Sequence, residues 1–239
     1  MNLVLDIGNT LVKIAFFNDG DLIERCNCHL DELSTILTNK DYDKGIVCSV
    51  NTVAHSHELL KLNPELILLN EKFKLPVINL YSSPDTLGYD RLANAVGSFC
   101  LTPNQNNLII DMGTCLKFDF INANNQYLGG SISPGLKMRY KALNTFTAKL
   151  PLLEDVNKTD LIGADTEGSI SSGVINGMTS EIDSMVNKYR EKYSQLNIYL
   201  TGGDAQVYIS IAETQKSSIF AHDYITLLGL NAILEENAA

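Results

Sequence analysis

Short apolar runs alternate with polar turns along the first part of the chain. Residues 2–6 and 11–17 are both apolar, and the tight turn IGNT separates them. The tripeptide Asn-Asp-Gly at 18–20 is typical of a β-hairpin. We therefore expect three antiparallel strands up to about residue 28.

The pattern of the next segment predicts strands followed by helices. Residues 44–50 and 75–81 have the composition of short strands, and an amphipathic helix is expected from about His55 to Leu62. A helical pattern follows from Arg91. It ends before the polar segment 102–107, which contains Pro and is the best candidate for a linker.

After this linker the pattern starts again. The expected elements are two strands joined by an acidic turn (NLIIDMGTCLKFDFIN), a third strand (NNQYLGGSIS), a helix (LKMRYKAL), a helix from Ser171 to about Lys192, a strand (196–203) and a last helix (225–237). The repeated start predicts a duplicated α/β unit, with domains at 1–105 and 106–239. A cleft between two such domains is a natural ligand site.

The composition of the chain argues against some classes of binding partner. The chain has 239 residues and a formal net charge of −10, which argues against nucleic acid because phosphate backbones are bound by Lys and Arg. No apolar run reaches the roughly 18 residues of a membrane span, and no secretory leader is expected. The five cysteines are scattered and odd in number, so we expect reduced thiols and a cytoplasmic protein.

The two acidic turns carry the first candidate chemistry. Asp6 and Asp111 each follow a buried strand, and each precedes a glycine by two positions. Glycine permits positive φ and lets a ligand approach the backbone. A carboxylate beside backbone N–H groups can hold a cation that bridges to phosphate oxygens, which Lys13 could also reach. One copy would be typical of a plain hairpin turn, whereas two copies favour a nucleotide site.

Two further motifs have a structural and a functional interpretation. TGGDA at 201–205 leaves room for a flat ring or a phosphate, but it is equally typical of a plain strand-to-helix turn. In LGYDR, Asp90 could accept a hydroxyl proton and Arg91 could bind an anion. Taken alone, this stretch favours a helix start with Arg91 on the solvated face. Motifs of P-loop enzymes, dinucleotide folds, zinc helices and serine hydrolases are lacking.

Taken together, these motifs carry a resemblance. DIGNTLVK, GYDR, DMGTC, GGSISPGL, TAKLP and TGGDA, in this order, resemble the type III pantothenate kinases of the acetate and sugar kinase/Hsp70/actin superfamily. The resemblance covers nearly the whole chain. It implies duplicated actin-like (ribonuclease H-like) α/β domains, and an enzyme that transfers phosphate from ATP to pantothenate in the first step of coenzyme A biosynthesis.

The resemblance also implies roles for individual residues. ATP contacts are expected at Asp6, Ile7, Gly8, Asn9, Thr10, Leu11, Val12, Lys13, Thr114, Gly202 and Gly203. Pantothenate contacts are expected at Tyr81, Gly88, Tyr89, Asp90, Arg91 and Thr166. Asp90 would be the general base. Asp6 would lie near the Mg²⁺ of ATP, and Asp111 would bind a monovalent cation, K⁺ or ammonium.

One position departs from the family pattern. Lys117 stands where the family's second loop usually has Thr, and it can replace part of the monovalent cation's charge if its side chain faces Asp111. The resemblance further implies a homodimer built by residues 106–239. A non-catalytic regulatory relative and a nucleotide or polyphosphate hydrolase are the alternatives, and the intact loops and the GYDR segment argue against them.

Overall fold

The chain forms two compact units. The computed structural model describes residues 1–38, 40–49, 63–153, 159–211 and 219–237. Unit 1 contains Met1–Asn104, Ile121–Gly129 and Tyr224–Ala239, and unit 2 contains Gln105–Phe120 and Gly130–Asp223. The first border lies near the expected linker, but the chain returns to unit 1 twice. A single cut at 105/106 therefore does not describe these compact units.

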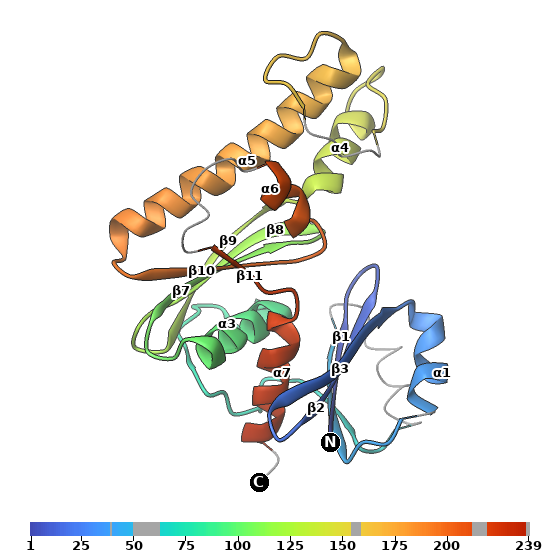
Figure 1. Ribbon diagram of the computed structural model, residues 1–239, viewed down its shortest axis with the longest axis vertical. Helices are drawn as coiled ribbons and strands as arrows, with labels where there is room; N and C mark the ends of the chain where they lie inside the picture. The colour runs from blue at the N-terminus through green and yellow to red at the C-terminus, as the bar shows by residue number, and fades with distance from the viewer. Residues whose placement is uncertain (39, 50–62, 154–158, 212–218, 238–239) are drawn as a thin grey trace. The chain divides into compact units, whose positions relative to one another are not determined.

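Unit 1 is built on a five-stranded sheet with the order β3-β2-β1-β4-β5 (Figure 1). Its strands are β1 (Asn2–Ile7), β2 (Val12–Asn18), β3 (Asp21–Cys28), β4 (Lys44–Ser49) and β5 (Leu66–Leu68). The first three strands are antiparallel, as expected. Asp19 and Gly20 form the turn between β2 and β3, and both have positive φ.

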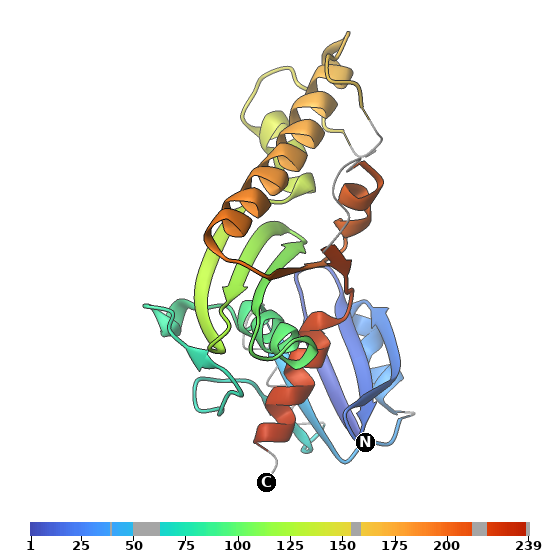
Figure 2. The ribbon, with the colours of Figure 1, turned by 60° about the vertical axis from the view of Figure 1, so that its left-hand side comes forward.

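Helices bury both faces of this sheet, which explains why β1 is apolar at consecutive positions. Leu3, Leu5 and Ile7 point to the core beside α1 (Leu33–Thr38), which follows the short 3₁₀ helix η1 (Leu30–Glu32). Val4 points to the opposite core, which α3 (Tyr89–Leu101) and α7 (Ile225–Glu236) complete. Figures 1 and 2 show α7 lying beside α3.

Unit 2 repeats the strand order of unit 1. Its strands are β7 (Asn106–Met112), β8 (Cys115–Ile121), β9 (Gln126–Pro134), β10 (Leu196–Thr201) and β11 (Ile219–Ala221), of which β9 belongs to unit 2 from Gly130 onward. The order β9-β8-β7-β10-β11 corresponds to β3-β2-β1-β4-β5, and β10 pairs parallel with β7 as β4 does with β1. Such a repeat is what a duplicated α/β unit predicts.

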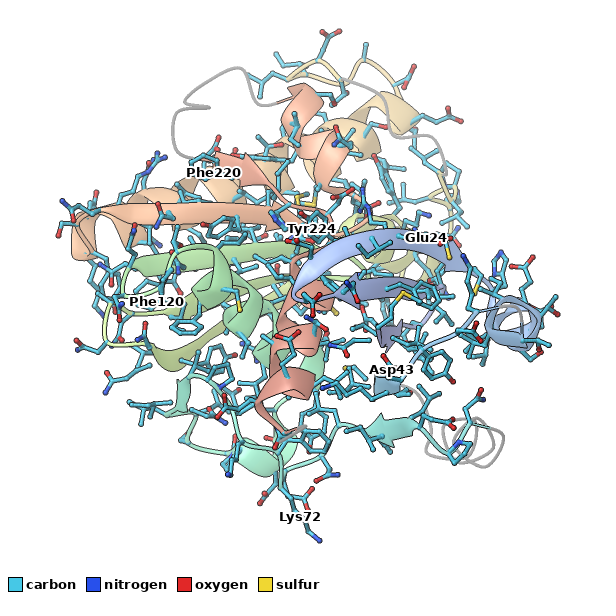
Figure 3. The ribbon with its side chains drawn as sticks, turned by 60° about the horizontal axis from the view of Figure 1, so that its bottom comes forward. Glu24, Asp43, Lys72, Phe120, Phe220 and Tyr224 are labelled. Atoms are coloured by element: carbon cyan, nitrogen blue, oxygen red, sulfur yellow. The ribbon has the colours of Figure 1, made fainter. Side chains whose placement is uncertain are left out.

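Three helices cover one face of the sheet of unit 2 (Figure 2). They are α4 (Leu136–Thr145), α5 (Thr166–Lys192) and α6 (Ala205–Ile211). Alternate residues of β7, such as Leu108 and Ile110, pack in a core with α5. Phe120 of β8, labelled in Figure 3, stacks on Tyr193 with 4.2 Å between ring centroids.

Some expected elements differ from the structure. The strand expected at 75–81 is reduced to β6 (Ile78–Asn79), which pairs with the start of β9. The backbone N–H of Tyr81 donates to the Asn79 side chain instead, which ends the pairing. The 3₁₀ helix η2 (Pro84–Thr86) follows. The helix expected at 55–62 lies outside the described residues.

The predicted start of α5 and the predicted end of the linker were also wrong. The helix begins five residues before the expected Ser171, because the Asp165 side chain accepts from the backbone N–H of Gly168 at 2.7 Å. The linker is shorter than 102–107, since β7 already includes Asn106 and Asn107.

Candidate active site

The first acidic turn joins β1 to β2 in unit 1. Asp6 is the penultimate residue of β1, and Gly8 donates its backbone N–H to the carbonyl of Leu11 at 3.1 Å, which closes the turn. Asn9 and Thr10 at the tip are exposed. Lys13 lies opposite Asp6 in the strand register, and its Nζ is 3.3 Å from Asp6 Oδ2. The turn thus presents exposed backbone groups beside one carboxylate and one ammonium.

The second acidic turn, in unit 2, has a similar arrangement. Asp111 is the penultimate residue of β7, and Gly113 donates its N–H to the carbonyl of Cys115 at 3.1 Å. Lys117, on the outgoing strand β8, places its Nζ 2.8 Å from Asp111 Oδ2. In both turns a carboxylate at the end of one strand therefore pairs with a lysine on the next.

The glycines of these turns do not use the positive φ that their position had indicated. Among the described glycines, positive φ occurs at Gly20, Gly129 and Gly202. At Gly8 the absence of a side chain matters instead, because an added Cβ would lie 3.2 Å from the carbonyl oxygen of Leu11.

Two other glycine segments pack directly on the second turn. Gly202 has a φ of 96°, and an added Cβ would lie 2.4 Å from the backbone of Met112. Gly135 is the N-cap residue of α4, and an added Cβ there would be 2.3 Å from the Gly113 carbonyl oxygen. The structure thus brings Gly202 of TGGDA and Gly135 of GGSISPG against the DMGTC turn at one end of the sheet of unit 2.

The GYDR segment forms the beginning of α3 in unit 1. Gly88 is the N-cap residue, and Asp90 lies in the first helical turn. An added Cβ at Gly88 would lie 2.5 Å from Asp90 Oδ1, so glycine leaves the carboxylate room to fold back over the helix start. A partly exposed carboxylate in this position can orient a hydroxyl group and accept its proton.

The LGYDR segment taken alone had indicated that Arg91 lies on a solvated face. The structure contradicts this. Arg91 is only 5% exposed. Its guanidinium carbon lies 5.5 Å from the centroid of the Tyr81 ring, the geometry of a cation–π contact. Tyr127 is also next to Tyr81, at 6.1 Å between ring centroids. The structure therefore brings together Tyr81, Arg91 and the start of α3.

Thr166 lies apart from the other expected site residues of unit 2. It is the first residue of α5 and lines a cavity of about 1120 Å³ between α4, α5 and the segments around them. Neither Asp111 nor Thr114 nor the TGGDA glycines line this cavity. Arg139 at its wall donates to the carbonyl of Pro134 and forms an ion pair with Glu181.

Several residues around these sites were given no role of their own from the sequence, although Gly129, Gly135 and Asp204 lie in the motifs GGSISPGL and TGGDA. Gly129 and Tyr127 hold the Tyr81 ring, and Gly135 supports the second turn. Burial raises the pKa of the Asp204 carboxyl above its ordinary value, and the nearby Lys137 partly opposes this shift. A positive φ and a close approach at a glycine depend on its neighbours in space, so the sequence contains no clear indication of them.

The comparisons with known proteins agree with these features. A model of the type III pantothenate kinase family matches residues 2–188. A type III pantothenate kinase of Phocaeicola vulgatus is 42% identical over 99% of this chain and 99% of its own. One of Bacteroides fragilis is 41% identical, with 99% and 98% covered.

This chain belongs to the type III pantothenate kinase family.

Solved structures share the fold of this family member at much lower identity. A conserved putative Baf family transcriptional activator from Campylobacter jejuni has a TM-score of 0.66 at 23% identity, with 99% of this chain and 98% of that one covered. A putative N-acetylmannosamine kinase from Listeria monocytogenes has a TM-score of 0.53 at 13% identity, with 98% and 99% covered. The expected fold class, duplicated actin-like α/β domains, is confirmed. Among the described helices, none has both the length and the apolar character that crossing a membrane needs.

Proposed function

We propose that this chain transfers the γ-phosphoryl group of ATP to the primary hydroxyl of pantothenate. The products are ADP and 4′-phosphopantothenate, and the reaction begins coenzyme A biosynthesis. The observation that carries the proposal is the match to the family along the chain, with relatives that cover 99% of it. The geometry of Gly88, Asp90 and Tyr81 supports a hydroxyl-binding site within unit 1.

In this proposal the acidic turns bind the phosphates of ATP. ATP arrives as its Mg²⁺ complex, and the metal supplies positive charge to the phosphate oxygens during transfer. Asp6 is suited to this complex because its buried carboxylate lies beside the exposed residues 9–11 of the turn and already pairs with Lys13. The backbone N–H groups of the turns and the Lys13 ammonium stabilise the spreading negative charge.

Asp90 acts as the general base of the proposed reaction. Its carboxylate accepts the proton of the pantothenate hydroxyl as the bond to phosphorus forms. Because the transition state is loose, the main contribution of Asp90 is to orient the hydroxyl. Arg91 is buried against Tyr81, which supports a part in holding the Tyr81 ring that contacts pantothenate.

Two aspects of the assembly belong to the same proposal. We propose a homodimer formed through unit 2, where Phe146, Leu161 and Ile162 are 86%, 81% and 82% exposed near the cavity that Thr166 lines. Large exposed apolar side chains are typical of protein interfaces. A cytoplasmic location fits the free thiols of Cys26, Cys28, Cys48, Cys100 and Cys115.

A coupled assay of ADP release tests the function and its base together. The purified chain receives MgATP with and without pantothenate, beside the variants Asp90→Asn and Asp85→Asn. We expect pantothenate-dependent ADP release whose kcat falls by about 10²–10⁴-fold in Asp90→Asn, with a much smaller change in KM. Asp85 lies in η2, shortly before α3, and is exposed, so its variant controls for loss of one negative charge.

The same assay separates the alternatives. ADP release that is equal without pantothenate would contradict the kinase and indicate a hydrolase. An Asp90→Asn variant with only a raised KM for pantothenate would show that Asp90 binds the substrate without acting as the base.

A further inference from the structure

The ion pair of Lys117 and Asp111 occupies the place where the family resemblance implies a monovalent cation. The two charged atoms are 2.8 Å apart, and the side chains are only 15% and 14% exposed. The pair of the first turn, Lys13 and Asp6, is longer at 3.3 Å, and the Lys13 side chain is 36% exposed. Lys117 is therefore a largely buried cation in direct contact with Asp111.

The local fold holds this lysine in place. Asp111 and Lys117 lie on the neighbouring strands β7 and β8, and the tight turn at Gly113 joins them. The other neighbour of β7 is β10, whose Thr201 lies opposite Asp111 in the register. Gly202 then packs on Met112, so the strand ends around the ion pair are fixed by backbone contacts. Lys117 thus extends from a strand whose backbone is fixed beside Asp111.

The charges of this site do not fit an additional monovalent cation. A buried carboxylate requires a positive partner, and the ammonium of Lys117 supplies one. An ammonium has three donors and no acceptor, so it cannot act as a ligand of a metal ion. A second cation at the same carboxylate would be repelled by the ammonium, and this repulsion is strong where water is excluded.

We propose that Lys117 is the built-in cation of the second phosphate turn, so that this enzyme works without K⁺ or ammonium. The inference rests on the proposed kinase function. The Lys117 ammonium neutralises Asp111, which removes the repulsion between that carboxylate and the phosphates of ATP. A soluble cation is unnecessary because the chain itself carries the charge.

The test compares the chain with Lys117→Thr and Lys117→Met in potassium, sodium and choline chloride at matched ionic strength. We expect the unmodified chain to have the same kcat/KM for ATP in all three salts. Lys117→Thr removes the ammonium and supplies a hydroxyl oxygen. Its kcat/KM should be low in choline and rise about tenfold or more in potassium, within the usual range of coupling between two bound ligands. Lys117→Met removes the charge without supplying an oxygen, so its kcat/KM should rise less in potassium than that of Lys117→Thr.

A second readout does not require activity. We expect potassium to raise the melting temperature of Lys117→Thr above its value in choline, because an ion that binds only the folded state stabilises it. The melting temperature of the unmodified chain should be equal in both salts. The melting experiment remains decisive if the kinase reaction is absent, so failure of the inference and failure of the proposed function are distinguishable.

Two results would overturn the inference. One is a strong requirement of the unmodified chain for potassium in the assay. The other is a potassium-specific rise in its melting temperature. Both measurements use the unmodified chain and therefore apply even if the variants fail to fold.

Discussion

At the scale of single residues, Gly129 controls the position of the Tyr81 ring. Gly129 has a φ of 97°, and an added Cβ would lie 2.9 Å from two ring atoms of Tyr81. Real Cβ atoms do not approach so closely, so the ring would have to move. Since the ring contacts Arg91 as well, its displacement would also disturb the start of α3. Gly129 is thus a positioning residue for the proposed pantothenate site.

Gly129→Ala should therefore weaken pantothenate binding. We expect the KM for pantothenate to rise by about tenfold, which corresponds to about 1.4 kcal/mol, while kcat changes less. Steady-state kinetics with varied pantothenate measures this. Gly20→Ala is the control, because Gly20 also has a positive φ, of 86°, but an added Cβ would contact nothing within 4 Å. An equal rise of KM in both variants would show that general backbone strain is responsible.

At the scale of elements, α3 and α7 approach each other through glycine. An added Cβ at Gly229 of α7 would lie 1.9 Å from the carbonyl oxygen of Ala93, and one at Gly97 of α3 would lie 2.1 Å from the carbonyl oxygen of Ile225. The Thr226 hydroxyl also donates to the Asn94 side chain at 2.6 Å in the buried contact. Because α3 begins with the GYDR segment, this contact supports the site.

Two helix glycines should respond in opposite directions to the same substitution. Gly229→Ala should lower the free energy of unfolding by about 1–3 kcal/mol, because a methyl group overpacks the contact with α3. Gly177→Ala should raise it by about 0.5–1 kcal/mol, because Gly177 is an exposed residue inside α5 with open space around it. Urea denaturation of both variants measures these changes. A stabilised Gly229→Ala would contradict the close approach of the two helices.

At the scale of the whole molecule, the exposed apolar residues of unit 2 predict self-association. Ile162→Asp should shift the protein from dimer to monomer, because a carboxylate in an apolar interface is costly to desolvate. Ile23→Asp is the control, since Ile23 is 61% exposed on β3 of unit 1. Sedimentation velocity measures the result. A monomeric unmodified chain, or equal dissociation of both variants, would refute the proposed interface.

Much of the fold could be predicted from local patterns. The first hairpins, the strands on each side of Asp111, the helix α3 and the final helix α7 follow from apolar runs and turn residues. The strand expected at 75–81 was mostly wrong, because strand pairing requires a partner and β9 offers its first residues only. The start of α5 was missed because its N-cap at Asp165 precedes weak helix formers such as Gly168.

The sequence by itself determined the family, the duplicated acidic turns and the candidate site residues, because short motifs and local turn chemistry are readable along the chain. The tertiary structure alone decided that α7 returns to unit 1, that Arg91 is buried against Tyr81 and that Lys117 meets Asp111. These outcomes depend on contacts between residues distant in sequence or on which way a strand faces. Local pattern does not specify such contacts, since they form only when the sheets and helices pack.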